Sequence, residues 1–338
     1  VVYQEKLGSV AAKTRRLEVL GRALAPVCGA NAENVATAAR ISKSDLLTEM
    51  VMEFPELQGL MGRYYAAAEG YAADIAAALD EQYQPRGAGG ALPQTRAGLA
   101  LAIAEKLDTL VGGFAIGAKP TGSKDPYALR RMAISLIRLI NENGLNLPLD
   151  RALAASAATY PAALAADKHT AAVRDYICER LDSYYRERGI RSETVQAVLA
   201  LNSDDLVDND HRIRALDTFA AGDNVKNLLA SAKRIRNILK KNGERDGAVQ
   251  TAHLQEPAEQ ALWQAWQDKQ PAFEQALAAG DYRAALEPLA TLGAPLDAFF
   301  TDVMVMSDDP ALQQNRLTLL TTLQRGFDKI ADLSLLSE

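Results

Sequence analysis

The sequence predicts an all-α fold, and three observations lead to that prediction. Apolar residues make up 48% of the 338 residues, and in long Ala/Leu-rich stretches they recur at the period of an α-helix. There are only 13 prolines, so few helices are interrupted. No segment alternates Val, Ile, Thr and Tyr between turn residues, which would be the pattern of a strand.

Loops rich in glycine and proline divide the first half of the chain. The segment QPRGAGGALPQ at 84–94 separates two helical regions. A second loop, GAKPTGSKDP at 117–126, precedes a helix with the sequence YALRRMAISLIRLI at 127–140. Ser123 or Asp125 can cap the N-terminus of that helix.

The second half follows a softer boundary and is again helical. Residues 145–170 are rich in alanine and low in charge, and the pattern from 171 to 241 is helical. The turn GERDG at 243–247 precedes three further helices. The dipeptides at 280–281 (GD) and 295–296 (PL) separate those three helices.

Charge and cysteine content limit the possible functions. The net charge is -6, so any contact with nucleic acid must come from a local basic patch. Cys28 and Cys178 lie too far apart in the sequence for a metal motif, which suits a reducing cytoplasm. No apolar run is long enough for a membrane span. The chain begins without methionine, and we expect it to be a fragment of a longer polypeptide.

Residues 45–65, DLLTEMVMEFPELQGLMGRYY, place carboxylates at helical spacing. Asp45, Glu49 and Glu53 share one side of the predicted helix. The opposite side predicts a buried face, formed by Leu46, Leu47, Met50, Val51, Phe54, Leu57 and Met61. The favoured interpretation is a core face opposite a solvated acidic face, with a break where Phe54 precedes Pro55.

A metal-dependent phosphohydrolase is the alternative interpretation of these carboxylates. It would use Asp45, Glu49 and Asp108, because carboxylates can hold Mg²⁺. The histidines are at 169, 211 and 253, so the first 168 residues offer no imidazole ligand. Asp108 also lies in a segment with apolar residues at core spacing, which favours a structural role.

The loop at 117–126 only partly matches a phosphate-binding loop. Its order is Gly-Ser-Lys where the motif requires Gly-Lys-Ser/Thr, and no strand precedes it. ATP binding by that mechanism is therefore excluded. Lys124, Arg130 and Arg131 can still meet a phosphate at the start of the next helix. A capped helix with solvated arginines explains the same residues.

Residues 225–241, VKNLLASAKRIRNILKK, form a basic amphipathic helix in an acidic chain. The segment has six basic residues and no acidic one. Lys226, Lys233 and Lys240 are seven residues apart and follow one flank, with Arg234, Asn237 and Lys241 beside them and Arg236 at the margin of the apolar face. Several phosphates could be bound by such a row. The alternative is a solvated helix that pairs with Asp204, Asp205 and Asp208.

Several long motifs in order resemble one family, the beta subunit of bacterial glycyl-tRNA synthetase. In the first half they are KLGS at 6–9, the segment at 45–65, EKLDTLVGGFAIG at 105–117 and PTGSKDPYALRR at 120–131. In the second half they are RIRNIL, LQEPAEQAL, AGDYRAAL and DAFFTDVMVMSDDPALQQNRLTLL. The resemblance covers nearly the whole chain.

The resemblance implies two domains, and it identifies the chain as the C-terminal portion of such a subunit. Residues 1–165 are similar to an HD-type helical domain that has lost its metal ligands. Residues 166–338 are similar to a helical-bundle anticodon-binding domain. In the family, the alpha subunit activates glycine with ATP and Mg²⁺, and it assembles with the beta subunit as a heterotetramer of two alpha and two beta subunits. The resemblance implies tRNA-Gly binding in the cytoplasm, with no catalytic residue, metal or cofactor in this fragment.

The predicted tRNA-binding residues combine the basic helix with weaker candidates. The set comprises Lys226, Lys233, Arg234, Arg236, Asn237, Lys240, Asn315, Arg316, Arg63, Lys124, Arg130 and Arg131. Phe299, Phe300 and Arg316 can stack on splayed bases, although at least one of the phenylalanines is expected in the core. Two alternatives remain: an HD-type carboxylate–metal phosphohydrolase, and a scaffold that only docks the alpha subunit.

Overall fold

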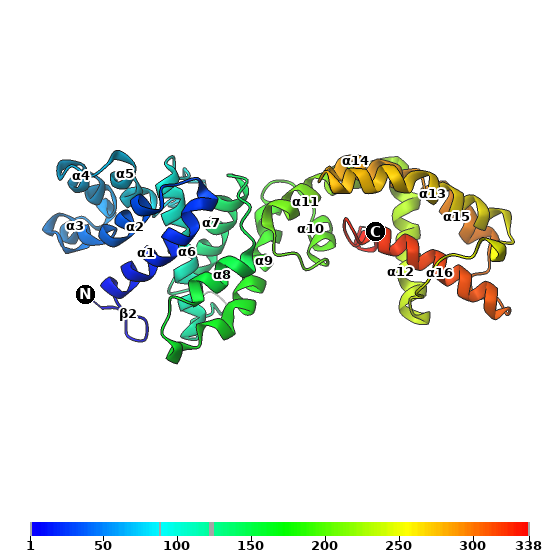
Figure 1. Cartoon of the computed structure of the whole chain (residues 1–338), viewed down its shortest axis with the longest axis horizontal. Coiled ribbons are helices and arrows are strands. Elements are labelled where there is room, and N and C mark those ends of the chain that lie inside the picture. The colour runs from blue at the N-terminus through cyan, green and yellow to red at the C-terminus, as the bar shows by residue number, and fades with distance from the viewer. Residues whose placement is uncertain (1, 88, 122–124, 337–338) are drawn as a thin grey trace. The chain divides into compact units, whose positions relative to one another are not determined.

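The computed structural model describes residues 2–87, 89–121 and 125–336, and it confirms the predicted all-α class (Figure 1). The one sheet formed by these residues has two short antiparallel strands, β1 (Val2–Gln4) and β2 (Gly8–Ser9). None of the described helices is both long enough and apolar enough to cross a lipid bilayer.

The chain divides into two compact units. Unit 1 comprises Val1–Tyr184 with Asp204–Val207, and unit 2 comprises Tyr185–Ser203 with Asp208–Glu338. Unit 1 therefore continues past residue 165, where the sequence alone places the domain boundary.

Unit 1 is built around the long helix α6 (Arg96–Ala115). The other elements of the unit are α1 (Val10–Cys28), α2 (Ala32–Ile41), η1 (Ser44–Leu47), α3 (Glu49–Glu53), η2 (Pro55–Leu57), α4 (Leu60–Ala68), α5 (Ala73–Glu81), α7 (Leu129–Asn141), α8 (Leu149–Ala157), η3 (Ala162–Leu164), η4 (Ala166–His169) and α9 (Thr170–Arg186), whose last two residues belong to unit 2.

Helix α6 is apolar on nearly all sides, which is typical of a central helix. It packs against α1, α5, α7 and α8. Small residues allow close approach: a Cβ on Gly112 would lie 2.4 Å from the Tyr160 hydroxyl. That hydroxyl donates a hydrogen bond of 2.7 Å to the backbone carbonyl of Asp108. The centre of unit 1 thus joins tight packing to buried polar groups.

Residues 45–65 do not form the predicted helix with one core face. They fold as the short elements η1, α3, η2 and α4, because Pro55 and the 3₁₀ turns interrupt the helical period. Leu47, Met50 and Phe54, predicted to be buried, are 62%, 42% and 47% exposed. Asp45, predicted to face solvent, is only 2% exposed. The predicted break at Pro55 is confirmed, since α3 ends at Glu53, and Val51 is buried as predicted. The predicted faces are wrong at Asp45, Leu47, Met50 and Phe54.

Unit 2 contains the predicted basic helix. It appears as α12 (Lys226–Asn242), which confirms the sequence boundaries to within one residue. The other elements are α10 (Ser192–Leu199), α11 (Leu206–Ala220), which begins with residues of unit 1, η5 (Asp223–Val225), η6 (Thr251–His253), α13 (Pro257–Ala278), α14 (Tyr282–Ala290), α15 (Gly293–Asp302), α16 (Pro310–Phe327) and η7 (Leu333–Leu335).

Candidate nucleic-acid interface

Helix α12 is held on unit 2 by its apolar face. Leu228, Ala232, Ile235 and Leu239 are buried at helical spacing, and the helix packs against α15, α16 and η7. Gly243, with φ of 80°, ends the helix in a conformation that glycine adopts without strain. This packing fixes which residues of α12 point to solvent.

The predicted lysine row lies on the solvent side of α12. Lys226, Lys233 and Lys240 are all exposed. The Lys226 ammonium is 2.8 Å from the Asp223 carboxylate, and both side chains are open to solvent. An exposed pair of this kind contributes little to stability.

A groove runs along the same helix and contains three of the predicted residues. Lys233, Arg234 and Asn237 line a space of about 600 Å³. Its remaining walls are Ala230, Ile238, Lys241, Asn242 and Met306, and no carboxylate lines it. Met306 is absent from the predicted set. Met306 could have been found in the sequence as an apolar residue in the polar segment before α16. In the structure its side chain is 42% exposed.

Arg234 is held against an aromatic ring. Its guanidinium carbon lies 4.4 Å from the centroid of the Phe300 ring, a distance typical of a cation–π contact. Phe299 is fully buried and meets Phe300 edge to face at 5.3 Å. Phe299 is therefore a core residue, as expected for at least one of the pair. Phe300 supports Arg234 in a defined position beside the groove.

Arg236 lies apart from the groove and makes internal ion pairs. Its guanidinium lies 2.7 Å from the Asp328 carboxylate and 3.2 Å from that of Asp332. These partners come from the end of the chain and differ from the acidic residues at 204–208 that the sequence suggested. Arg236 thus ties α12 to the segment after α16, which gives it a structural role, and its RNA contact stays a prediction.

Asn315 and Arg316 are also placed differently from the prediction. Both lie on α16 and are only 4% and 5% exposed. The Asn315 side chain accepts a hydrogen bond from the Gln250 amide and donates one to its carbonyl, at 2.7 and 3.0 Å. Arg316 forms a buried ion pair with Glu259 and donates to the carbonyl of Met304 at 2.8 Å. We therefore leave both residues out of the surface proposed below.

The weaker candidates in unit 1 lie on two helices. Arg63 on α4 and Arg131 on α7 are exposed, and Arg130 is half-buried. Lys124 lies outside the described residues. The Asp125 carboxylate accepts hydrogen bonds from the amides of Leu129 and Arg130 at 2.7 and 3.0 Å. Asp125 therefore already occupies the amide donors that a phosphate would use at this helix start.

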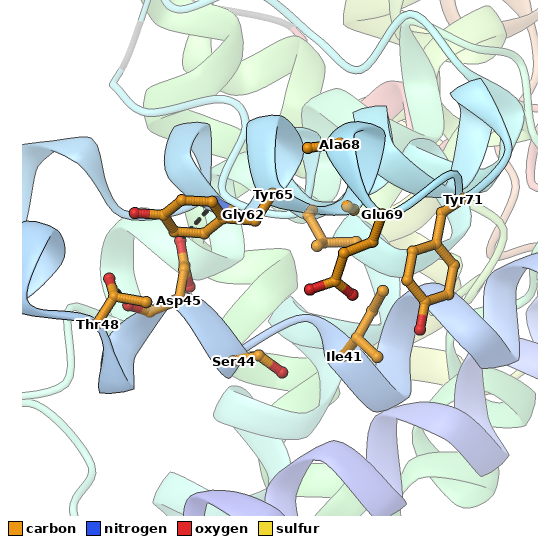
Figure 2. Close-up of a pocket in the computed structure, with 11 residues that line it drawn as sticks. Ile41, Ser44, Asp45, Thr48, Gly62, Tyr65, Ala68, Glu69 and Tyr71 are labelled. Atoms are coloured by element: carbon orange, nitrogen blue, oxygen red, sulfur yellow. Dashed lines mark hydrogen bonds between the residues drawn. The ribbon is translucent and has the colours of Figure 1, made fainter.

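Two of the three carboxylates of the alternative metal hydrolase, Asp45 and Asp108, have structural roles. One oxygen of Asp45 accepts hydrogen bonds from the amides of Gly59 and Gly62 at 2.7 and 3.1 Å, which caps the start of α4 (Figure 2). Glu49 is exposed on α3. No group of three or more His, Cys, Asp or Glu side chains in the described part of the chain could hold a metal ion.

Asp108 lies in a buried ionic cluster. Its carboxylate is 2.8 Å from the Lys13 ammonium and 2.6 Å from the Arg16 guanidinium, and it accepts a hydrogen bond of 3.0 Å from the Tyr160 hydroxyl. Lys13 is also 3.1 Å from Glu105. Side-chain cations thus stand where a metal would be needed to balance the charge of Asp108.

Burial and neighbouring charges together shift the pKa values of Glu105 and Lys106 in this cluster. Burial alone would raise the pKa of Glu105, but Lys13, Lys43 and Lys106 outweigh it and lower that pKa to about 2. For Lys106, burial lowers the pKa to about 7, and Lys43 and Lys13 add to that effect. The Lys106 ammonium donates to the backbone carbonyls of Gln82 and Gln84. The cluster is therefore a structural network at the centre of unit 1.

Two family models match different parts of the chain. The family model described as Glycyl-tRNA synthetase beta subunit matches residues 1–200, more than half of the chain. The chain belongs to the glycyl-tRNA synthetase beta subunit family. A second family model, described as DALR anticodon binding domain, matches residues 228–333 of this chain. That match begins in α12 and includes the whole groove.

Curated relatives that match the whole chain are described as glycine–tRNA ligase beta subunits. The chain is 57% identical over 337 residues to the glycine–tRNA ligase beta subunit of Dichelobacter nodosus, covering 100% of the chain and 49% of that relative. The corresponding subunit of Methylobacillus flagellatus is 45% identical over 340 residues, covering 100% of the chain and 48% of the relative. The chain spans about half the length of the curated relatives it matches.

Proposed function

We propose that the chain is the tRNA-binding part of a glycine–tRNA ligase beta subunit and that the exposed face of α12 binds tRNA-Gly. The observation that carries this proposal is the groove on α12. It has three cationic side chains, no carboxylate in its lining, and a position inside the segment that matches an anticodon-binding domain. In a chain with a net charge of -6, such a local concentration of positive charge favours phosphates.

The groove can receive an unpaired stretch of RNA. Lys233 and Lys241 supply charge for backbone phosphates, and Asn237 can donate to and accept from a base edge. Arg234 presents a planar guanidinium on which a splayed base can stack. Lys240 and Lys226 extend the positive charge along the helix beyond the groove.

The rest of the ligase reaction is assigned to a partner. The chain supplies no catalytic residue in this proposal, and it positions tRNA-Gly for glycylation by an alpha subunit that uses ATP and Mg²⁺. The two subunit types would assemble as a heterotetramer of two alpha and two beta subunits. Neither a metal nor a cofactor is required in this chain.

The test is fluorescence anisotropy of labelled tRNA-Gly with the chain over a salt series, with a non-cognate tRNA measured beside it. The double variant Lys233→Ala/Lys240→Ala should weaken binding and reduce the slope of log affinity against log salt by about one to two. The matched control is Lys6→Ala/Lys168→Ala, which removes the same charge from two exposed positions in unit 1. An unchanged slope in the first variant would remove α12 from the interface. Absence of binding by the unmodified chain at low salt would overturn the proposal.

A further inference from the structure

Unit 1 has an acidic surface that RNA binding does not use. The surface is formed by residues 45–71, which contain five carboxylates, Asp45, Glu49, Glu53, Glu56 and Glu69, against a single base, Arg63. All but Asp45 are exposed. None of the four exposed carboxylates forms an ion pair with any described residue. This surface repels phosphates and attracts positive charge.

The same short elements expose large apolar side chains. Of the thirteen exposed large apolar or tyrosine side chains in the described residues, seven lie within residues 47–71: Leu47, Met50, Met52, Phe54, Tyr64, Tyr65 and Tyr71. Single exposed apolar residues are common, but a concentration of them indicates a protein contact. Methionine and tyrosine are also enriched in such contacts. The acidic surface is therefore apolar as well as negative.

A pocket of about 420 Å³ opens between η1 and α4, lined in part by Asp45, Tyr65, Glu69 and Tyr71 (Figure 2). Asp45 is 98% buried, since only 2% of it is exposed. One of its carboxylate oxygens receives the two amides at the start of α4, but the other receives no hydrogen bond from any described residue. A buried carboxylate oxygen without a donor is costly. A donor that enters the pocket from outside removes that cost.

We propose that this pocket receives an arginine side chain of the alpha subunit and that the surrounding acidic surface is the docking site for that subunit. The proposal rests on the proposed function, which requires such a partner. A guanidinium suits the pocket because it donates to Asp45 and Glu69 while its plane stacks on the Tyr65 or Tyr71 ring. The exposed apolar side chains around the pocket favour a protein surface over a free amine, because they offer area that a small ligand cannot cover.

Two variants test the pocket directly. Asp45→Asn keeps an oxygen for the amides of Gly59 and Gly62 but replaces the unpaired oxygen by an NH₂ group, which opposes a guanidinium. Glu69→Lys reverses one exposed charge at the rim. We expect affinity for the purified alpha subunit, measured by isothermal titration calorimetry with the whole chain, to fall at least tenfold for Glu69→Lys and severalfold for Asp45→Asn. Glu193→Lys makes the same charge change at an exposed position in unit 2 and should leave the affinity unchanged.

The readouts separate this proposal from the RNA proposal. Both pocket variants should keep the circular dichroism spectrum of the folded chain and its anisotropy curve with tRNA-Gly. Two results would overturn the docking site and leave the tRNA proposal standing. One is an affinity for the alpha subunit that is unchanged in both variants, and the other is failure of the unmodified chain to bind the alpha subunit. Sensitivity of alpha-subunit binding to the pocket variants, without tRNA binding by the unmodified chain, would instead overturn the RNA proposal alone.

Discussion

Two clusters of charge, one in each unit, have opposite environments. In unit 1, Lys13 and Arg16 lie buried against Asp108 at ion-pair distance, with Tyr160 closing the network. In unit 2, Lys233 and Arg234 lie exposed along a groove whose lining has no carboxylate. From the sequence, Asp108 and the cations at 226–241 were both candidate functional charges on helices. The available counter-charge distinguishes them.

The comparison shows why a basic residue is not by itself an RNA contact. Arg236 lies on the same helix as Arg234, yet it is bound to Asp328 and Asp332. Arg316 forms a buried pair with Glu259. Charges that the fold neutralises belong to the scaffold, because a ligand would first have to break their pairs. Exposed charges that line a groove without a carboxylate in its lining can meet an external anion.

The largest effect is expected at the buried cluster. Asp108→Asn leaves Arg16 buried without a carboxylate and Lys13 with Glu105 as its remaining carboxylate, and it should lower the free energy of unfolding by about 3–5 kcal/mol. Urea denaturation followed by circular dichroism measures this change. A loss below about 1 kcal/mol would show that the cluster is solvated in solution and would break the comparison.

A control uses the exposed pair at the start of α12. Asp223→Asn removes the partner of Lys226, and the urea midpoint should stay where it is because both groups are open to solvent. At a temperature where Asp108→Asn remains folded, its affinity for tRNA-Gly should equal that of the unmodified chain. Together these results would assign stability to the buried cluster and binding to α12.

The pH dependence of stability should show the cost of burying Lys106. Its pKa is about 7 in the folded chain, well below the usual value of 10.5, so between these values the unfolded chain binds the extra proton. Stability therefore rises with pH over this range, by at most about 1.4 kcal/mol per unit from this residue. The penalty is fully present below pH 7.

Comparison with Lys106→Met isolates this contribution. The variant loses the hydrogen bonds to the carbonyls of Gln82 and Gln84, which shifts its whole stability curve. The slope is therefore the readout: between pH 7 and 9.5 the unmodified chain should gain stability relative to the variant. Parallel curves would mean that Lys106 stays protonated in this range and that its two hydrogen bonds offset the burial.

The parts of the fold that follow local periodicity could be predicted from the sequence. Helix α12 appears where its apolar residues recur at 3.6 positions, and its solvent face carries the predicted lysines. In the segment at 45–65 the faces were predicted wrongly because Ser44–Leu47 form a separate 3₁₀ turn, in which Leu47 is exposed and Asp45 is buried. A helical wheel assumes a continuous α-helix, so it cannot show a 3₁₀ turn.

Site residues with distant partners could not be predicted. Arg316 lies 57 positions from Glu259, and Asn315 lies 65 positions from Gln250. Neither separation leaves a periodic signal in the sequence, so both residues looked like free polar groups on a helix. Phe300 beneath Arg234 is a contact of the same kind, 66 positions apart by their numbers. The sequence therefore indicated which helix carries the exposed cations, but not which of its cations are held by the fold.

The smallest effect, and the sharpest test of the groove, is expected at Arg234. Arg234→Lys keeps the charge but loses the plane that Phe300 supports, so affinity for tRNA-Gly should fall about threefold to tenfold with the salt slope unchanged. Phe300→Leu should have a similar effect through the loss of that support. Arg325→Lys is the control, because Arg325 is exposed and pairs with Glu244 and Asp246. Two results would mean that α12 binds RNA through charge alone: a reduced salt slope in Arg234→Lys, or full affinity in both variants. The cations of α12 would then differ from those of the buried cluster only in their exposure.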